Sequence, residues 1–201
     1  MRRAAIVCAS GALCAAVAAL SPAPGAALPR AAAAGSPALS YSHDSSRVVQ
    51  RQPPAGSCHA RGRGLFALPD ARCTPGALDP AVRQRTIYAT ICRPGWTETV
   101  RPPESVSERE KYASMAAYGV RGSASRYEYD HLVPLELGGA PNDPRNLWPE
   151  LDYARREGYD LNPKDQLEYN LNRRVCAGTM TLARAQLLIA RDWVAAWRRY
   201  G

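Results

Sequence analysis

The segment from Tyr127 to Glu150 constrains the fold of this chain more than any other part of its sequence. Residues 127–131 have strand character, a turn rich in glycine and proline follows, and residues 146–148 can return as a second strand. A helix is expected to start at Asn162-Pro163, because asparagine is a favoured N-cap and proline suits the first helical position. The sequence therefore predicts the local order strand, loop, strand, helix.

Two adjacent side chains of this segment, Asp130 and His131, have the functional groups for chemistry near neutral pH. A neutral imidazole can take a proton from water, and a carboxylate is a hard oxygen ligand suited to Mg²⁺, Mn²⁺ or Ca²⁺. Neighbouring strand residues point to opposite faces, so both can serve one site only at a strand end or a bulge. The amide of Asn146 could reach the ring across the paired strands and fix its tautomer.

A set of short motifs carries a resemblance to a known family: Asp130-His131, Val133-Pro134-Leu135, Gly138-Gly139 and Asn146-Leu147. Together they resemble the HNH endonuclease superfamily, whose fold is called ββα-metal or His-Me finger. The resemblance implies that His131 is the general base and Asp130 a metal ligand. It implies that Asn146 orients the histidine or braces the loop, and Asn146 is taken as the orienting residue. It also implies hydrolysis of phosphodiester bonds in DNA or RNA, with little sequence specificity and with Mg²⁺ or Mn²⁺ as cofactor.

The resemblance places a further metal ligand on the helix after the second strand, and several residues are candidates: Asp152, Asn162, Asp165 and Glu168. Asp165 is taken as this ligand, although Asn162 and Asp165 also suit the N-cap and the N3 position of the helix. Arg126 and Arg145 could hold flanking phosphates of the substrate as bidentate partners.

A wider resemblance, over residues 73–200, is to small exported bacterial proteins described as HNH-like, and it implies a shared fold without establishing an activity. It includes Cys73-Thr74-Pro75-Gly76-Ala77, Ile91-Cys92 and Lys164-Asp165. The expected fold class is α+β and predominantly helical, with a small ββα-metal core, flanking helices and disulfides.

Other elements are predicted from periodicity and capping. Residues 96–100 alternate like a short strand, and Ser107–Glu110 is a capping box for a helix that ends at Gly119. The helix from Asn162 has a buried stripe that recurs every four residues, namely Leu167, Leu171 and Val175. A last helix is expected over about residues 182–200.

The N-terminus has the pattern of an export signal, predicted over residues 1–34. Arg2-Arg3 provides the positive start, residues 4–20 are apolar, and prolines and small residues follow. A retained membrane anchor is the alternative, but the apolar run is short for a span. We therefore expect a secreted, extracellular protein without stable membrane association, built from a disordered linker over 35–57 and one nuclease-like domain over 58–201.

Four cysteines follow the predicted signal: Cys58, Cys73, Cys92 and Cys176. An even number in an exported chain predicts two disulfides, for which three pairings exist. We favour Cys58–Cys73, which closes a local loop, and Cys92–Cys176, which ties the first half of the domain to a late helix. Because the spacings contain no C-x-x-C pair, a structural zinc site is not expected.

The net charge suits a polyanionic partner such as nucleic acid. Three of the eight net positive charges belong to Arg2, Arg3 and Arg30 in the predicted signal, which leaves +5 for the remainder. A second hypothesis is a catalytically inactive secreted binding or scaffold domain that reuses the ββα fold. A third is an exported toxin that needs an immunity partner, and the oligomeric state stays open.

Overall fold

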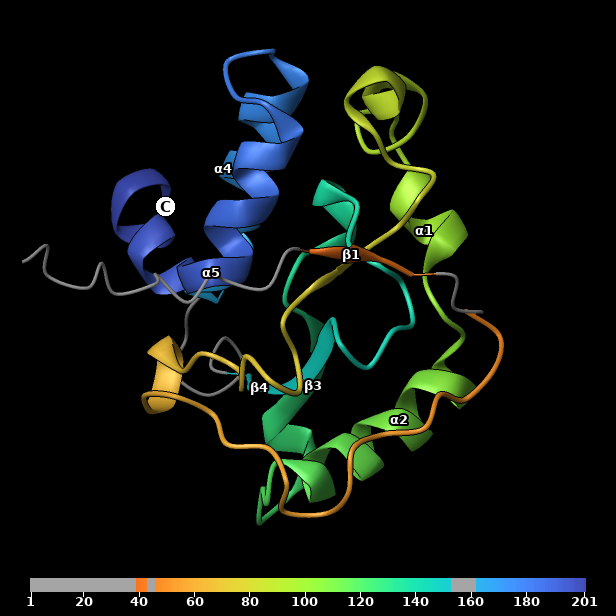
Figure 1. Cartoon of the computed structure of the whole chain (residues 1–201), viewed down its shortest axis with the longest axis vertical. Coiled ribbons are helices and arrows are strands. Elements are labelled where there is room, and N and C mark those ends of the chain that lie inside the picture. The colour runs from red at the N-terminus through yellow and green to blue at the C-terminus, as the bar shows by residue number, and fades with distance from the viewer. Residues whose placement is uncertain (1–38, 43–45, 153–161) are drawn as a thin grey trace, which may run out of the picture. The chain divides into compact units, whose positions relative to one another are not determined.

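The computed structural model describes residues 39–42, 46–152 and 162–201, so the predicted signal over 1–34 lies outside the described residues (Figure 1). This part of the chain is mixed α+β with more helix than strand, as expected. Two small sheets are present: β1 (Ser40–Tyr41) pairs in parallel with β2 (Ala77–Leu78), and β3 (Tyr127–His131) pairs antiparallel with β4 (Leu147–Leu151). The α-helices are α1 (Trp96–Val100), α2 (Glu104–Ala117), α4 (Pro163–Cys176) and α5 (Leu182–Tyr200). The short 3₁₀ helices are η1 (Gly64–Phe66), η2 (Gln84–Ala89), η3 (Ala124–Arg126) and η4 (Leu135–Leu137).

The predicted order strand, loop, strand, helix is confirmed by β3, β4 and α4. In the β3–β4 register Asp130 lies opposite Trp148 and His131 opposite Leu147, so both polar residues lie at the end of their strand. In Figure 1 the strands lie near α2 on one side, and the sheet places its C-terminal β3 residues near the start of α4.

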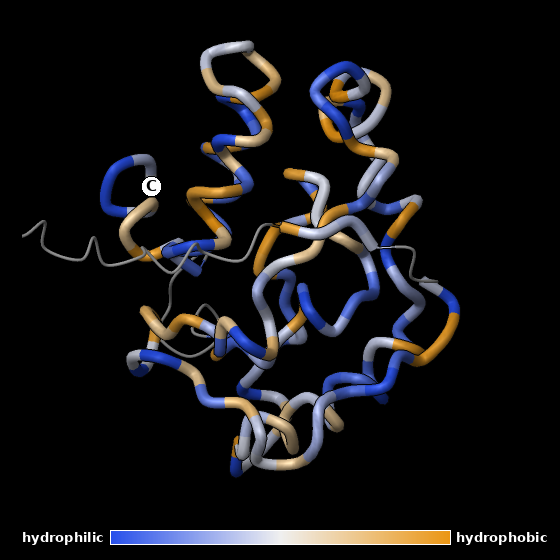
Figure 2. The backbone as a smooth tube through the Cα atoms, in the orientation of Figure 1, coloured by the Kyte–Doolittle hydropathy of each residue, from blue (hydrophilic) through white to orange (hydrophobic). Residues whose placement is uncertain are grey.

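The two C-terminal helices form much of the core because each has one apolar face. The predicted stripe of α4, Leu167, Leu171 and Val175, is fully buried, and polar and apolar residues alternate along its turns in Figure 2. Thr181 caps α5 by accepting a hydrogen bond from the Arg184 backbone N–H. Trp193 of α5 is also fully buried and donates from Nε1 to the Ala67 carbonyl.

The predicted type of one element and the predicted start of another are wrong. Residues 96–100 form the short helix α1 and not a strand, because Gly95 turns the chain with a φ of 75° and the Thr99 hydroxyl donates to the Trp96 carbonyl. Helix α2 begins at Glu104, after Pro103, and the predicted capping residue Ser107 therefore lies inside it.

The structure contains disulfides between Cys58 and Cys73 and between Cys92 and Cys176, the two pairs favoured on the sequence alone. The second pair joins residues 84 positions apart and fixes the C-terminal end of α4 to the segment after η2. Among the described helices, none is both long enough and apolar enough to cross a membrane.

The prediction of a disordered linker over 35–57 is wrong for its described residues. Tyr41 lies in a strand, the Gln50 backbone N–H donates to Glu110 at 2.6 Å, and Asn142 donates to the Val48 carbonyl at 2.8 Å. The segment lacks apolar periodicity because it contributes backbone groups to partners elsewhere and does not form a helix or a long strand of its own.

Candidate functional site

His131 ends strand β3 with its ring held by one hydrogen bond. Nε2 lies 2.9 Å from the Pro141 carbonyl oxygen, and because a carbonyl can only accept, this nitrogen carries the hydrogen. In the neutral ring Nδ1 then keeps its lone pair. Burial lowers the pKa of His131, against the opposing effect of Asp130 and with a contribution from Arg101, so the neutral form is favoured at pH 7. The ring is therefore oriented and able to accept a proton.

The hydrogen bonds of the Asn146 side chain hold the loop and do not reach the His131 ring, so of its two expected roles the structure shows the bracing one. Its fully buried amide accepts from the Val133 backbone N–H at 3.0 Å and donates to the carbonyls of Val133 at 3.0 Å and Ala140 at 3.1 Å. Ala140 precedes Pro141, so Asn146 fixes the loop that carries the carbonyl partner of the histidine. The Pro141 carbonyl therefore orients the His131 ring, and Asn146 holds the loop that contains Pro141.

Gly139 shows how tightly this loop is packed. A Cβ atom at this position would lie 1.7 Å from the Val133 carbonyl oxygen and 2.7 Å from Nδ2 of Asn146. No other residue can occupy the position without moving the backbone, so Gly139 allows the loop to pack closely against the backbone of Val133, just after β3.

The carboxylate of Asp130 forms an ion pair with the ammonium group of Lys164. Nζ of Lys164, in the first turn of α4, forms an ion pair with the Asp130 carboxylate and a second one with Glu168. It also donates to the His131 carbonyl oxygen at 2.8 Å. The Lys164 side chain is 0% exposed, and although burial favours its neutral form, Asp130 and Glu168 outweigh that effect and raise its pKa. The two residues form a buried ion pair beneath the end of β3.

Carboxyl groups outnumber cations around this ammonium. Glu150 lies 3.8 Å from Nζ of Lys164 and shares a hydrogen bond with Asp130. Burial raises the pKa of Glu150 and of Glu168, while the pKa of Asp130 is lowered, because Lys164 and its hydrogen bonds outweigh the effect of burial. Burial and the charges of Asp130 and Asp165 raise the pKa of Glu128 to about 8. Part of this cluster is therefore protonated near neutral pH.

The predicted metal site, Asp130 with Asp165, does not fit this arrangement. Asp130 faces an ammonium, and the Asp165 carboxylate accepts a hydrogen bond from the Asn162 backbone, which is the helix-capping role. Within residues 39–42, 46–152 and 162–201, no three His, Cys, Asp or Glu side chains form a group that could hold a metal ion. A divalent ion needs several oxygen ligands at short distance, and the Lys164 ammonium already binds one oxygen of Asp130 and one of Glu168.

Neither of the predicted phosphate-binding residues, Arg126 and Arg145, lines a hollow that His131 also lines. The guanidinium of Arg145 pairs with Asp143 and donates a hydrogen bond to Ser40, so its N–H groups already have partners. Arg126 precedes the first residue of β3, so it is five residues from His131, roughly 16 Å along an extended strand. Their part in substrate binding stays a prediction.

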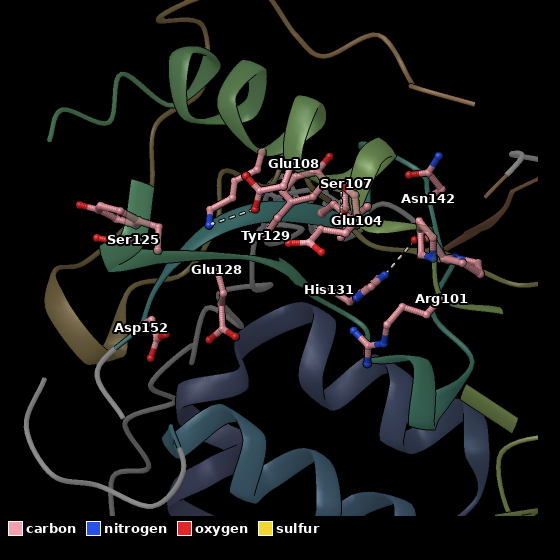
Figure 3. A pocket seen from close by; sticks show the side chains of 15 residues that line it. Arg101, Glu104, Ser107, Glu108, Ser125, Glu128, Tyr129, His131, Asn142 and Asp152 are labelled. Carbon is pink, nitrogen blue, oxygen red and sulfur yellow. Dashed lines mark hydrogen bonds and ion pairs between the residues drawn. The ribbon is translucent and has the colours of Figure 1, made fainter. Parts of the chain in front are cut away.

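Arg101 is the cation that lies beside the histidine. Figure 3 shows its guanidinium next to the His131 ring, and its charge contributes to the lowered pKa of that ring. Arg101, Glu128 and His131 line two hollows, of about 480 and about 280 Å³. The larger hollow runs along β3 and the start of α2, and the smaller one reaches Asp130, Asp165 and Glu168.

The sequence did not predict a role for Arg101 or Lys164, nor the ion pair between Glu168 and Lys164. Arg101 is one of many arginines, and nothing in its neighbourhood along the chain distinguishes it. Lys164 did carry a signal, because the chain has only two lysines among 26 basic residues. Because an ammonium and a guanidinium are not interchangeable, the two lysines could have been singled out on this ground.

Comparison with protein-family models finds no matching family, and neither the curated proteins nor the solved structures contain a match to this chain. The resemblance to HNH endonucleases therefore rests on the sequence motifs.

Proposed function

We propose that this protein is an exported, HNH-like endonuclease that hydrolyses phosphodiester bonds of DNA or RNA with low sequence specificity. The observation that carries the proposal is the His131 ring, neutral, fixed at Nε2 by the Pro141 carbonyl and placed beside the Arg101 guanidinium at a hollow. A fixed base next to a phosphate-binding cation is the minimum that water attack on a phosphodiester requires.

In the proposed reaction each residue has one role. Nδ1 of His131 takes a proton from a water, the resulting hydroxide attacks phosphorus, and the bond to the leaving oxygen breaks, with solvent protonating that oxygen. Arg101 binds the non-bridging oxygens, whose negative charge grows as the attack proceeds. Pro141 orients the ring, and Asn146 keeps the Pro141 loop in place.

Two properties of the whole chain support this proposal. The charge of +5 that follows the predicted signal attracts polyanions, and phosphate contacts bind nucleic acid without reading its sequence. The two disulfides fit an oxidising compartment outside the cytoplasm, where a signal over residues 1–34 would deliver the protein.

Cleavage of supercoiled plasmid DNA and of a labelled RNA by the oxidised protein tests the proposal. We expect His131→Ala to lose about 10²- to 10⁴-fold in rate, the usual contribution of a general base. His59→Ala is the matched control, because His59 is an exposed histidine remote in sequence from the site, and it should cleave like the wild type.

Equal cleavage by the wild type and His131→Ala would reveal a contaminating nuclease and contradict the proposal. Nucleic-acid binding without cleavage by any of the three proteins would instead support the alternative, an inactive binding domain on the same fold.

A further inference from the structure

Lys164 occupies a position where a cation is unfavourable unless something holds it there. It lies in the first turn of α4, where the helix dipole favours negative charge, and its side chain is 0% exposed. Burying an unpaired ammonium costs several kcal/mol, so the surrounding acceptors must compensate. The ordinary place for a lysine in a helix is the solvated face near the C-terminus.

The acceptors around Lys164 match an ammonium atom for atom. Its three N–H groups meet three oxygens, those of Asp130, Glu168 and the His131 carbonyl. A guanidinium is planar and longer, and could not present three donors to one small cage. The choice of lysine in an arginine-rich chain follows from this geometry.

The two carboxylates that hold the ammonium are groups that a divalent ion would need. Asp130 is the residue that the resemblance assigns to the metal. Glu168 binds the same Lys164 ammonium from α4, the helix on which the resemblance places a further metal ligand. A second cation within a few ångströms of a buried ammonium would be repelled strongly, because charges interact with little screening in a protein interior.

We propose that the Lys164 ammonium is the resident cation of this site, standing in the place of a divalent metal, so that the protein neither binds nor needs one there. This inference rests on the proposed function only where it concerns cleavage. Lys164 is a positioning residue: it balances Asp130 and holds the His131 carbonyl, and Arg101 alone meets the substrate phosphate.

Mn²⁺ binding, followed by the loss of the free-ion signal in electron paramagnetic resonance, tests the substitution independently of activity. We expect no tight Mn²⁺ site in the wild type, the gain of one ion per chain in Lys164→Met, and loss of that ion in Lys164→Met/Asp130→Asn. Lys111→Met, the other lysine of the chain, should behave like the wild type because Lys111 pairs with Glu108 outside the cage.

One tight Mn²⁺ in the wild type that Asp130→Asn abolishes would overturn the proposal, and so would a folded Lys164→Met that gains no ion. If Lys164→Met does not fold, the wild type and Asp130→Asn decide the matter by themselves.

Cleavage in EDTA supplies the second arm. Unchanged cleavage by the wild type supports the proposal, whereas cleavage that vanishes in EDTA and returns with Mg²⁺ or Mn²⁺ overturns it. Absence of cleavage in every condition counts against the proposed function, and the Mn²⁺ titration then still decides whether Lys164 takes the place of a metal.

Discussion

Two carboxylates with lowered pKa values, Asp70 and Asp130, are stabilised by different kinds of partner. Asp70 lies in the turn before the Cys73 disulfide and accepts from the backbone N–H groups of His59 at 2.8 Å and Arg72 at 2.9 Å. Burial raises the pKa of Asp70, but the hydrogen bonds from Arg72 and His59 outweigh it and lower the pKa to about 2. Asp130 instead depends on one ammonium that other carboxyl groups share.

The difference separates a carboxylate with sufficient donors from a cluster of carboxyl groups with too few cations. Donors outnumber carboxylates at Asp70, so the group stays ionised and ties residues 57–74 to one another. Carboxyl groups outnumber cations around Lys164. Burial is the first cause of the raised pKa values of Glu128, Glu150 and Glu168, and the negative charge of Asp130 raises each of them further. Burying carboxyl groups with too few cations reduces stability, and perturbed pKa values of this kind cluster at functional sites.

The largest effect is expected from removing the shared cation. Lys164→Met leaves Asp130 and its neighbours buried without their counter-ion, and we expect a loss of about 3–5 kcal/mol in the free energy of unfolding. Lys111→Met should lose less than about 1 kcal/mol, because its partner Glu108 is exposed. Urea denaturation of both variants measures the difference, and equal losses would contradict the distinction.

Glu128 gives the site a dependence on pH that differs in sign from that of Asp70. Its folded pKa of about 8 exceeds its usual 4.5, so the folded state binds the extra proton and stability falls as the pH rises between these values. Glu128→Gln should flatten this slope, which is at most about 1.4 kcal/mol per pH unit for one group. Thermal melting from pH 5 to 8 measures the slope, and a variant as steep as the wild type would refute the assignment.

Asp70 should produce the smallest effect, on the acid side. Its folded pKa is below the usual 3.8, so its contribution is present above about pH 4 and is lost as the pH falls toward 2. Asp70→Asn keeps one acceptor and should cost about 1 kcal/mol at pH 7. Acid titration of the unfolding transition should show a shallower loss for the variant than for the wild type, and parallel curves would count against this role.

The local pattern of the sequence predicted much of the fold. Asn162-Pro163 predicted the start of α4, the four-residue recurrence from Leu167 predicted its buried face, and strand character predicted β3. These features depend on neighbouring residues, which capping and periodicity describe. The prediction of a strand at residues 96–100 was wrong, because five alternating residues fit either a strand or one helical turn. The backbone turn at Gly95 starts a helix there.

The sequence by itself determined that Asp130 and His131 end a strand, that a Gly-Gly loop follows, and that a helix comes after the second strand. Only the tertiary structure decided which groups meet them: the Pro141 carbonyl at the ring, Arg101 beside it, and Lys164 on the carboxylate. Residues 101 and 131 lie 30 positions apart and 130 and 164 lie 34 apart, and contacts at such separations depend on the packing of whole elements. The charge on one buried ammonium, and hence the identity of the cation in the site, is set by that packing.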